Sequence, residues 1–372
     1  MDNLINQNKI ESIPVVMLGS FGHAGIDWVH SLLDNHDEIL IMPAFSFFRS
    51  IDRVEFNTDL NFDDSDNKST TKAISSLFLH DNAYQLKRRK IIDKNNLVEF
   101  EKNLFFYLNN SLEKNKKKKL FFGIHYAYSK IYGIDLNKKK LIVSHEHLSW
   151  HSKKYLEYFN SKFLFIFRDP RAVLGGGILR MQNSNSDKII NAFQYDTMIL
   201  DMLTAFKFFL KNKDISYHLL NETMHLDLKK EMMKLARLLN INFSFSMLEQ
   251  TFLGQEWKGE SSYLAKDELE NSPPNDYYFP KNVEKRWRSI LSDEEILIIE
   301  VVFEKMMKEF NFKFDNKLSL MKKVKGYFLF FTKYQHQQKY FFNKHIIILR
   351  NILRRLVILF SEKQFKTLFK FK

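Results

Sequence analysis

The stretch IPVVMLGSFGHAGIDWVHSLLDNH, residues 13–36, predicts the fold of the region around it. Its first residues are apolar with a β-branched bias, which favours a strand ending at Gly19. A short loop with Gly22 and Gly25 follows, and apolar residues then recur at helical spacing. A strand, a glycine loop and a helix in this order can seat a phosphate on backbone N–H groups, and a plain β–α turn is the alternative. The loop lacks the Walker pattern, so ordinary ATP or GTP hydrolysis is not the first interpretation.

The composition is that of a globular chain. The 372 residues are 45% hydrophobic and 27% charged, which allows one large domain or two modest ones. There is no cysteine, so disulfides and thiolate chemistry are excluded, as fits a cytoplasmic protein. The first residues lack the apolar core of a signal peptide, and no apolar run is long enough to span a bilayer. We therefore expect a protein that is soluble or bound at a membrane surface.

The positive charge is concentrated at the C-terminal end. Residues 317–372 hold 14 of the 57 Lys and Arg residues and one of the 44 acidic residues. The rest of the chain holds 43 of each and carries no net charge. A neutral body with a basic tail is therefore predicted.

Short apolar segments alternate with amphipathic ones along most of the chain. We expect strands at 13–18, 141–143, 163–167 and 215–219, and helices at 26–35, 150–159, 170–180, 227–239 and 293–310. This order predicts an α/β fold with a P-loop-like parallel sheet flanked by helices. The expected domains are an α/β domain at 12–315, with a helical insertion or cap at 56–140, and a basic helical tail at 316–372.

A second segment of the sequence also predicts phosphate binding. The apolar residues 163–167 read as a buried strand, and RDPRAV follows at once. Arg168 is thereby placed at the carboxyl edge of the sheet, where open α/β sheets bind ligands. A forked guanidinium suits phosphate there. An ion pair with Asp169 is the alternative.

Together the two segments resemble the sulfotransferases that use 3′-phosphoadenosine 5′-phosphosulfate (PAPS) as donor. Family members carry a loop like S-F-P-K-S-G-T-T-W and, later, a strand leading into R-[DN]-P-[KR]-x-V. Here SFGHAGIDW occupies 20–28 and RDPRAV occupies 168–173. HSLLDNHDEI at 30–39 is typical of bacterial and Golgi-type members, and residues 221–241 and 287–312 resemble two later family segments. The resemblance covers about residues 13–314 in the right order.

The resemblance assigns the 5′-phosphosulfate of the donor to the first loop. The predicted binding residues are Ser20, Gly22, His23, Ala24, Gly25, Ile26, Asp27 and Trp28. His23 replaces the family lysine that contacts the transferring group, and a protonated imidazole could act as that cation. Ile26 and Asp27 replace two threonines. Asp27 suits the helix dipole but would repel a phosphate, so it either stabilises the helix N-terminus or orients His23 or an acceptor hydroxyl.

The resemblance also assigns the 3′-phosphate. Arg168 is its main predicted contact, and Gly176, within the run 175–177, replaces the family serine. Lys281 and Arg288 are further candidates. Both could equally be solvated charges beside Trp287.

The sequence VSHEH, residues 143–147, precedes the arginine strand at about the distance at which family members carry K-T-H-L-P. His145 matches the histidine that accepts the acceptor's proton, and a neutral imidazole is a suitable general base. Glu146 or His147 could act instead, because the strand register is open. A rival interpretation makes His145, His147 and His151 metal ligands. With no cysteine and no clear carboxylate partner we expect no metal, and histidines in a polar loop are the remaining alternative.

The tail segment IIILRNILRRLVILF, residues 346–360, is amphipathic. Arg350, Arg354 and Arg355 share one face, and apolar residues lie opposite. Such a helix suits an anionic membrane interface. Docking on the protein's own body is the alternative, and the long apolar face argues against nucleic acid.

We therefore expect a bacterial-type, PAPS-dependent sulfotransferase, cytoplasmic and peripheral on the inner face of the membrane through 317–372. His145 is its predicted base, and His23 is predicted to stabilise the transferring group. Its acceptor is expected to be a hydroxyl of a surface glycan or glycolipid. Two alternatives stay open: an inactive sulfotransferase-fold protein that binds a polyanion or a partner, and a transferase that uses another phosphorylated donor. The oligomeric state is also open.

Overall fold

The structure is a computed structural model, and it describes residues 9–42, 45–57, 60–79, 94–184, 192–257, 285–332 and 352–359. The chain divides into two compact units. Unit 1 consists of 1–20, 25–167 and 208–259, and unit 2 consists of 21–24, 168–207 and 260–372. The first loop is shared, because residues 21–24 belong to unit 2. The predicted domain boundaries stay a prediction.

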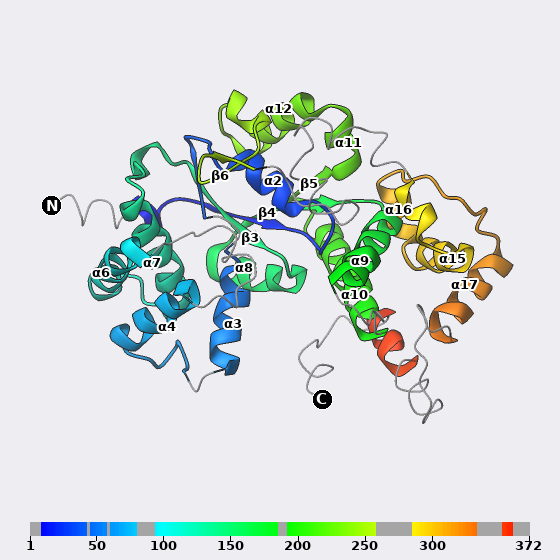
Figure 1. Cartoon of the computed structure of the whole chain (residues 1–372), viewed down its shortest axis with the longest axis horizontal. Helices are drawn as coiled ribbons and strands as arrows, with labels where there is room; N and C mark the ends of the chain where they lie inside the picture. The colour runs from blue at the N-terminus through cyan, green and yellow to red at the C-terminus, as the bar shows by residue number, and fades with distance from the viewer. Residues whose placement is uncertain are drawn as a thin grey trace. The chain divides into compact units, whose positions relative to one another are not determined.

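Unit 1 is built on a five-stranded parallel sheet (Figure 1). The strands are β1 (Val15–Gly19), β2 (Ile39–Ile41), β3 (Leu141–Glu146), β4 (Lys162–Phe167) and β5 (Ser216–Leu220), in the order β2-β3-β1-β4-β5. All four neighbouring pairs are parallel. The predicted α/β fold with a parallel sheet is therefore confirmed. Strand β2 was not predicted, because three apolar residues give no readable period.

Helices cover both faces of this sheet. α2 (Ile26–Leu33) and α12 (Leu228–Leu239) lie on one face, and α8 (Ser152–Phe159) lies on the other (Figure 1). The rings of Phe163 and Phe165 in β4 pack on Phe208, 4.7 and 6.0 Å between centroids. Strands buried on both faces read as continuous apolar runs, which is why β4 was visible in the sequence. Gly19 pairs with Glu146 of β3 and Phe165 of β4, so three strand ends meet at one edge.

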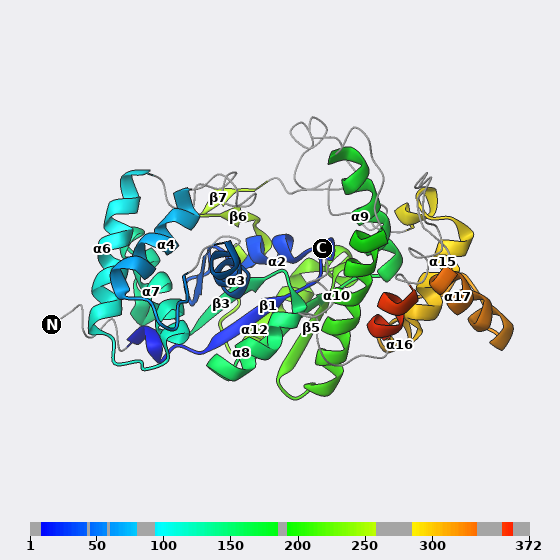
Figure 2. The same cartoon turned by 90° about the horizontal axis from the view of Figure 1, so that it is seen from below.

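The described chain between β2 and β3 is mainly helical. It forms α3 (Phe47–Asn57), α4 (Asn67–Leu79), α6 (Lys94–Asn110) and α7 (Lys116–Ile131), with α6 and α7 side by side in both views (Figures 1 and 2). Tyr107 and Tyr126 join α6 to α7 with ring centroids 5.3 Å apart. A Cβ at Gly123 would lie 2.9 Å from the Tyr107 ring, so glycine permits this close approach.

Unit 2 is helical in its described part. Its helices are α9 (Pro170–Ser184), most of α10 (Ala192–Lys211), α15 (Asp293–Val302), α16 (Glu304–Glu309), α17 (Leu320–Thr332) and residues 352–359. Buried Arg171 joins several of these segments. It donates to Glu300 Oε1 and to Asp169 Oδ2, both at 2.6 Å, and its guanidinium lies over the Trp287 ring at 4.3 Å. Removing one partner of such a buried charge costs about 3–5 kcal/mol.

The tail helix of residues 352–359 binds α10 within unit 2. Arg354 Nε and Arg355 Nε donate to the two carboxylate oxygens of Asp196 at 2.6 and 2.8 Å. Arg355 also donates to the Phe330 carbonyl and lies over the Phe330 ring. Leu353 and Leu356 are 56% and 37% exposed. The arginine face is therefore directed at the protein, and Arg350 lies outside the described residues.

Candidate functional site

The turn before α2 depends on Gly25. Gly25 has φ 101°, a left-handed conformation that favours glycine, and a Cβ there would clash with Asn221 Nδ2. Before the turn, Ser20 Oγ donates to the Ile166 carbonyl at 3.1 Å, which ties the end of β1 to β4. α2 then begins without a side-chain cap, and Asp27 lies in its first turn. The two residues that flank this loop in unit 1, Ser20 and Gly25, are thus fixed by short contacts within that unit.

Ile26 and Trp28 face the protein interior. Both are buried, and the Trp28 ring stacks on His225 with centroids 4.4 Å apart and planes 23° apart. Their side chains therefore hold α2 in place. A donor contact at these two positions stays a prediction and would use the backbone.

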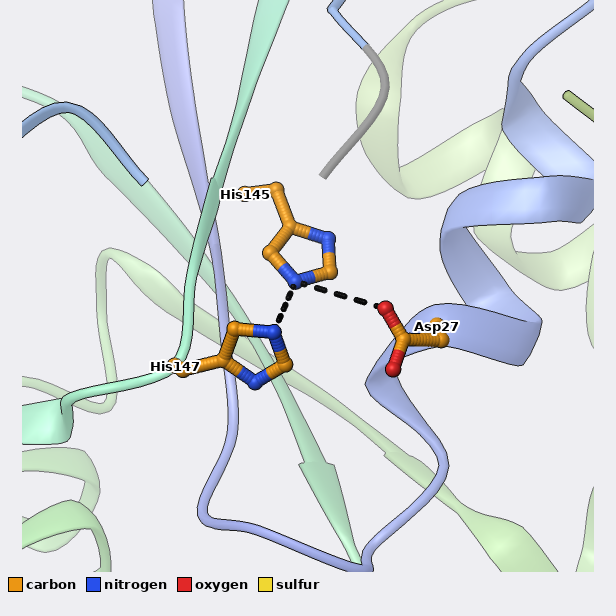
Figure 3. A group of neighbouring side chains, drawn as sticks. All are labelled: Asp27, His145 and His147. Carbon is orange, nitrogen blue, oxygen red and sulfur yellow. Dashed lines mark hydrogen bonds and ion pairs between the residues drawn. The ribbon is translucent and has the colours of Figure 1, made fainter. Parts of the chain in front are cut away.

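Three histidines form a hydrogen-bonded chain at the end of β3. His145 Nδ1 lies 3.0 Å from His30 Nδ1, and His145 Nε2 lies 3.0 Å from His147 Nε2. Asp27 Oδ1 lies 3.8 Å from the same His145 Nε2 (Figure 3). His30 and His145 are buried, and His147 is half-buried. The cluster therefore joins the first turn of α2 to the carboxyl end of β3.

This histidine chain can relay a proton. Each link needs one N–H and one lone pair, and two tautomer arrangements of neutral imidazoles satisfy both links. A proton accepted at half-buried His147 can pass to His145, with the tautomers exchanging along the chain. A nearby carboxylate stabilises an imidazolium, and Asp27 is placed to do so.

A second network surrounds Glu146. His151 Nδ1 lies 3.2 Å from Glu146 Oε2, and His151 Nε2 lies 3.2 Å from Asp52 Oδ2. Burial by itself lowers the pKa of His151, but the carboxylates of Glu146 and Asp52 raise it to about 9. Burial raises the pKa of Asp52, and its bonds to His151 and Lys154 bring it down to about 2. His151 is therefore protonated at neutral pH and paired with fully buried Glu146.

The contacts of Glu146 distinguish it from His145 and His147, the other residues that the sequence offers as the general base. Glu146 lies in an ion pair, and its side chain alternates to the opposite face from His145. His151 binds two carboxylates and is not in the Asp27–His145–His147 group. The sequence showed no clear carboxylate partner for the histidines, and the structure corrects this with Asp27, 3.8 Å from His145 Nε2. His30 was missed too, although it lies three residues after Asp27, on the same helical face.

Arg168, the predicted contact of the 3′-phosphate, lies in unit 2. Arg168 Nη1 donates to the His23 carbonyl at 3.0 Å, and His23 has φ 67°. Arg168 Nε is buried and has no hydrogen-bond partner among the residues that the structure describes. Asp169 forms an ion pair with Arg171 at 2.6 Å, where the sequence offered Arg168 as its alternative partner. A guanidinium N–H that no described residue accepts suits an anion.

Gly176, Arg288 and Lys281 are the other residues predicted to contact the 3′-phosphate. Gly176 is buried in α9. Its neighbour Gly177 allows close packing, because a Cβ there would lie 2.5 Å from Met198 Sδ. Arg288 binds Asp315 and lies over the Trp287 ring at 5.2 Å. Lys281 lies outside the described residues. Their roles toward a donor stay predictions.

Three solved structures are similar to the chain over most of its length. A sulfotransferase domain from the Synechococcus PCC 7002 olefin synthase is 15% identical, covering 81% of this chain and 95% of that one, with TM-score 0.43. A sulfotransferase domain from the curacin biosynthetic pathway is 12% identical, covering 81% and 98%, with TM-score 0.49. Mouse sulfotransferase SULT7A1, complexed with PAP, is 11% identical, covering 87% and 94%, with TM-score 0.39.

No family model matches the sequence, and no curated protein matches it. At these identities and TM-scores the likeness carries no argument about the site.

Proposed function

We propose that the chain is a sulfotransferase that moves a sulfuryl group from PAPS to a hydroxyl of an acceptor. The observation that carries this proposal is the position of His145. The histidine that the motif assigns as base is hydrogen-bonded to His147 and His30, and it lies 3.8 Å from Asp27. Asp27 belongs to the helix that follows the loop to which the motif assigns the donor.

The chemistry needs a proton acceptor and stabilised anionic oxygens. The acceptor oxygen forms a bond to sulfur as the bond from sulfur to the 5′-phosphate oxygen breaks, leaving adenosine 3′,5′-bisphosphate. The hydroxyl proton passes to the pair His145–His147, and Asp27 stabilises the imidazolium. His23 and the loop N–H groups are assigned to the charge that builds on the sulfuryl and leaving oxygens, as in related phosphoryl transfers.

Arg168 supports the use of a donor with a 3′-phosphate. Its guanidinium is always charged, and the carbonyl of His23 holds one of its nitrogens. The buried Nε has no hydrogen-bond partner in the described ranges, which leaves one N–H for an anion. The proposal assigns the 3′-phosphate of PAPS to this guanidinium.

Calorimetry with adenosine 3′,5′-bisphosphate on the full-length protein tests the donor. We expect binding to one site, and binding at least about 10-fold weaker for adenosine 5′-monophosphate, which lacks the phosphate assigned to Arg168. Absence of binding would remove PAPS as the donor. Equal binding of both nucleotides would remove the assignment of Arg168.

The helix α17 has an exposed apolar side that bears on the acceptor. Leu320, Met321, Val324 and Phe328 are each more than 60% exposed and share one side of this helix. At helical spacing, Lys323 and Lys325 lie on either side of this stripe. No helix in the described ranges is long and apolar enough to cross a membrane. An exposed apolar stripe flanked by lysines suits an anionic membrane interface, so we propose that α17 binds the membrane and that the acceptor is a glycan or glycolipid there.

Flotation with vesicles of mixed anionic and zwitterionic lipid tests this surface. The double variant Val324→Glu, Phe328→Glu should lose flotation, because it places two carboxylates in the exposed stripe. The matched variant Val98→Glu changes an exposed apolar residue of α6 and should float as the parent does. Equal flotation of both variants would place the membrane contact elsewhere.

A further inference from the structure

Three side chains that metals bind converge in unit 1. Asp27, His145 and His147 each offer one ligand atom, and these atoms all lie within 4.8 Å of one another (Figure 3). Over the ranges that the structure describes, this is the one such group of three. We propose that Asp27, His145 and His147 bind a divalent transition-metal ion of the zinc class.

The spacing is close to that of a tetrahedral zinc site. Two ligand atoms at the usual Zn–N distance and a tetrahedral angle lie about 3.3 Å apart. The two Nε2 atoms are 3.0 Å apart, and Asp27 Oδ1 is 3.8 Å from His145 Nε2. The ligand atoms of Asp27 and His147 lie within 4.8 Å of each other, so changes of up to about 1.5 Å in these distances bring all three atoms to the tetrahedral spacing. Two imidazoles and one carboxylate, with a fourth position open, form a donor set that zinc and iron use in enzymes.

The backbone presents these ligands together. His145 and His147 are two residues apart at the carboxyl end of β3, so their side chains point to the same side. Asp27 comes from the first turn of α2. Ligands on a strand end and a helix start of one compact unit lose little freedom when an ion binds.

His30 supplies the outer contact that metal-binding histidines have. Its Nδ1 lies 3.0 Å from His145 Nδ1, and its side chain is fully buried. This hydrogen bond fixes the ring of His145 and directs the Nε2 lone pair toward Asp27 and His147. Outer contacts of this kind typically change metal affinity about 10–100-fold.

The inference goes beyond the proposed sulfuryl transfer and uses some of the same side chains. A nitrogen lone pair that binds a metal ion cannot accept the proton of an acceptor hydroxyl. Zinc binding and base catalysis therefore compete for His145 and His147. Bound zinc is expected to inhibit the transfer.

The test is direct metal binding to EDTA-treated, full-length protein. Co²⁺ is titrated first, because its visible absorption reports the coordination geometry, and Zn²⁺ then displaces it. We expect one ion per chain with the intense absorption of tetrahedral Co²⁺. Asp27→Asn keeps the size of the side chain, and it should weaken binding by more than about 10-fold. His147→Ala should do the same, and His30→Gln should weaken binding with all three ligands retained.

The matched control is His218→Ala, which removes a histidine on the edge strand β5. It should bind the metal as the parent does. Thermal unfolding of each metal-free variant shows whether it is folded. No saturable binding, or equal binding by the parent and Asp27→Asn, would overturn the proposal. Because no donor or acceptor is present, this failure would leave the transferase proposal intact, and failure of nucleotide binding would leave the metal site intact.

Discussion

β3 and β4 lie on either side of β1 in one sheet, yet different chemistry follows each strand. At the end of β3 the side chains are titratable groups in contact: His145 bonds to two other histidines, and Glu146 pairs with protonated His151. After β4 the chain has a permanent cation, Arg168, with one buried N–H that no described residue accepts. The first end offers lone pairs to a proton or a metal ion. The second offers charge to an anion, and each can be tested without the other.

Removing the histidine at the end of β3 should have the largest effect. We expect His145→Ala to lower sulfuryl transfer by about 10²–10⁴-fold, the usual contribution of a general base. The affinity for adenosine 3′,5′-bisphosphate, measured by calorimetry, should stay within about threefold, because His145 accepts a proton and does not hold the nucleotide. His218→Ala should leave both values unchanged. An unchanged rate for His145→Ala would remove His145 from the mechanism.

The ion pair behind β3 should dominate stability. His151→Ala leaves Glu146 buried without its partner, and the free energy of unfolding should fall by about 3–5 kcal/mol at pH 7 in urea. The pKa of His151 is raised to about 9 in the folded protein. The contribution of protonated His151 to stability is therefore full below about pH 6.5 and is lost as the pH rises through about 9.

His125 provides the opposite pH dependence. Burial lowers the pKa of His125 to about 4. Stability should therefore fall as the pH drops from about 6.5 toward 4, because the unfolded chain then binds the extra proton. His151→Ala should remove the loss of stability at alkaline pH and keep the loss of stability at acid pH. An alkaline loss of the same size in His151→Ala would show that another group causes it.

The cation after β4 should have an intermediate effect. Arg168→Lys keeps the charge but removes the fork and Nε–H, so the affinity for adenosine 3′,5′-bisphosphate should fall by about 10–100-fold. The affinity for adenosine 5′-monophosphate should change little. Arg237→Lys, an exposed change on α12, is the control. A parallel loss for both nucleotides would show that Arg168 does not act on the 3′-phosphate.

The smallest effect is expected at Asp27. Asp27→Asn removes a carboxylate that would repel a phosphate, so the bisphosphate should bind about fivefold tighter, from about 1 kcal/mol of repulsion. The same variant should bind zinc more weakly. Calorimetry measures both ligands on one protein sample. Weaker nucleotide binding would instead give Asp27 a role in holding the donor.

Most of the sheet was predictable, because buried parallel strands are continuous apolar runs with a helix after each. The place of His145 at the end of a strand was also predictable, from its motif, and its role as the base stays a prediction. The contacts of His145 with His30 and Asp27 could not be predicted. These residues lie more than 100 positions from His145 in the sequence, and their contacts depend on the register between β1 and β3. The pairing of Asp169 with Arg171 rather than Arg168 depends on where α9 begins. The predicted helix at 293–310 is two helices, α15 and α16, divided at Phe303.

The contact of Arg354 and Arg355 with Asp196 bears on how the chain can be shortened. The Asp196 side chain is 1% exposed and accepts from both guanidinium groups. A chain that stops before residue 352 would leave this carboxylate without either of them, at a cost of several kcal/mol. A premature stop codon or a proteolytic cut upstream of the last described helix should therefore lower the amount of folded protein. The helix of residues 352–359 is in this respect a part of the folded unit, and it cannot be trimmed as an appendage.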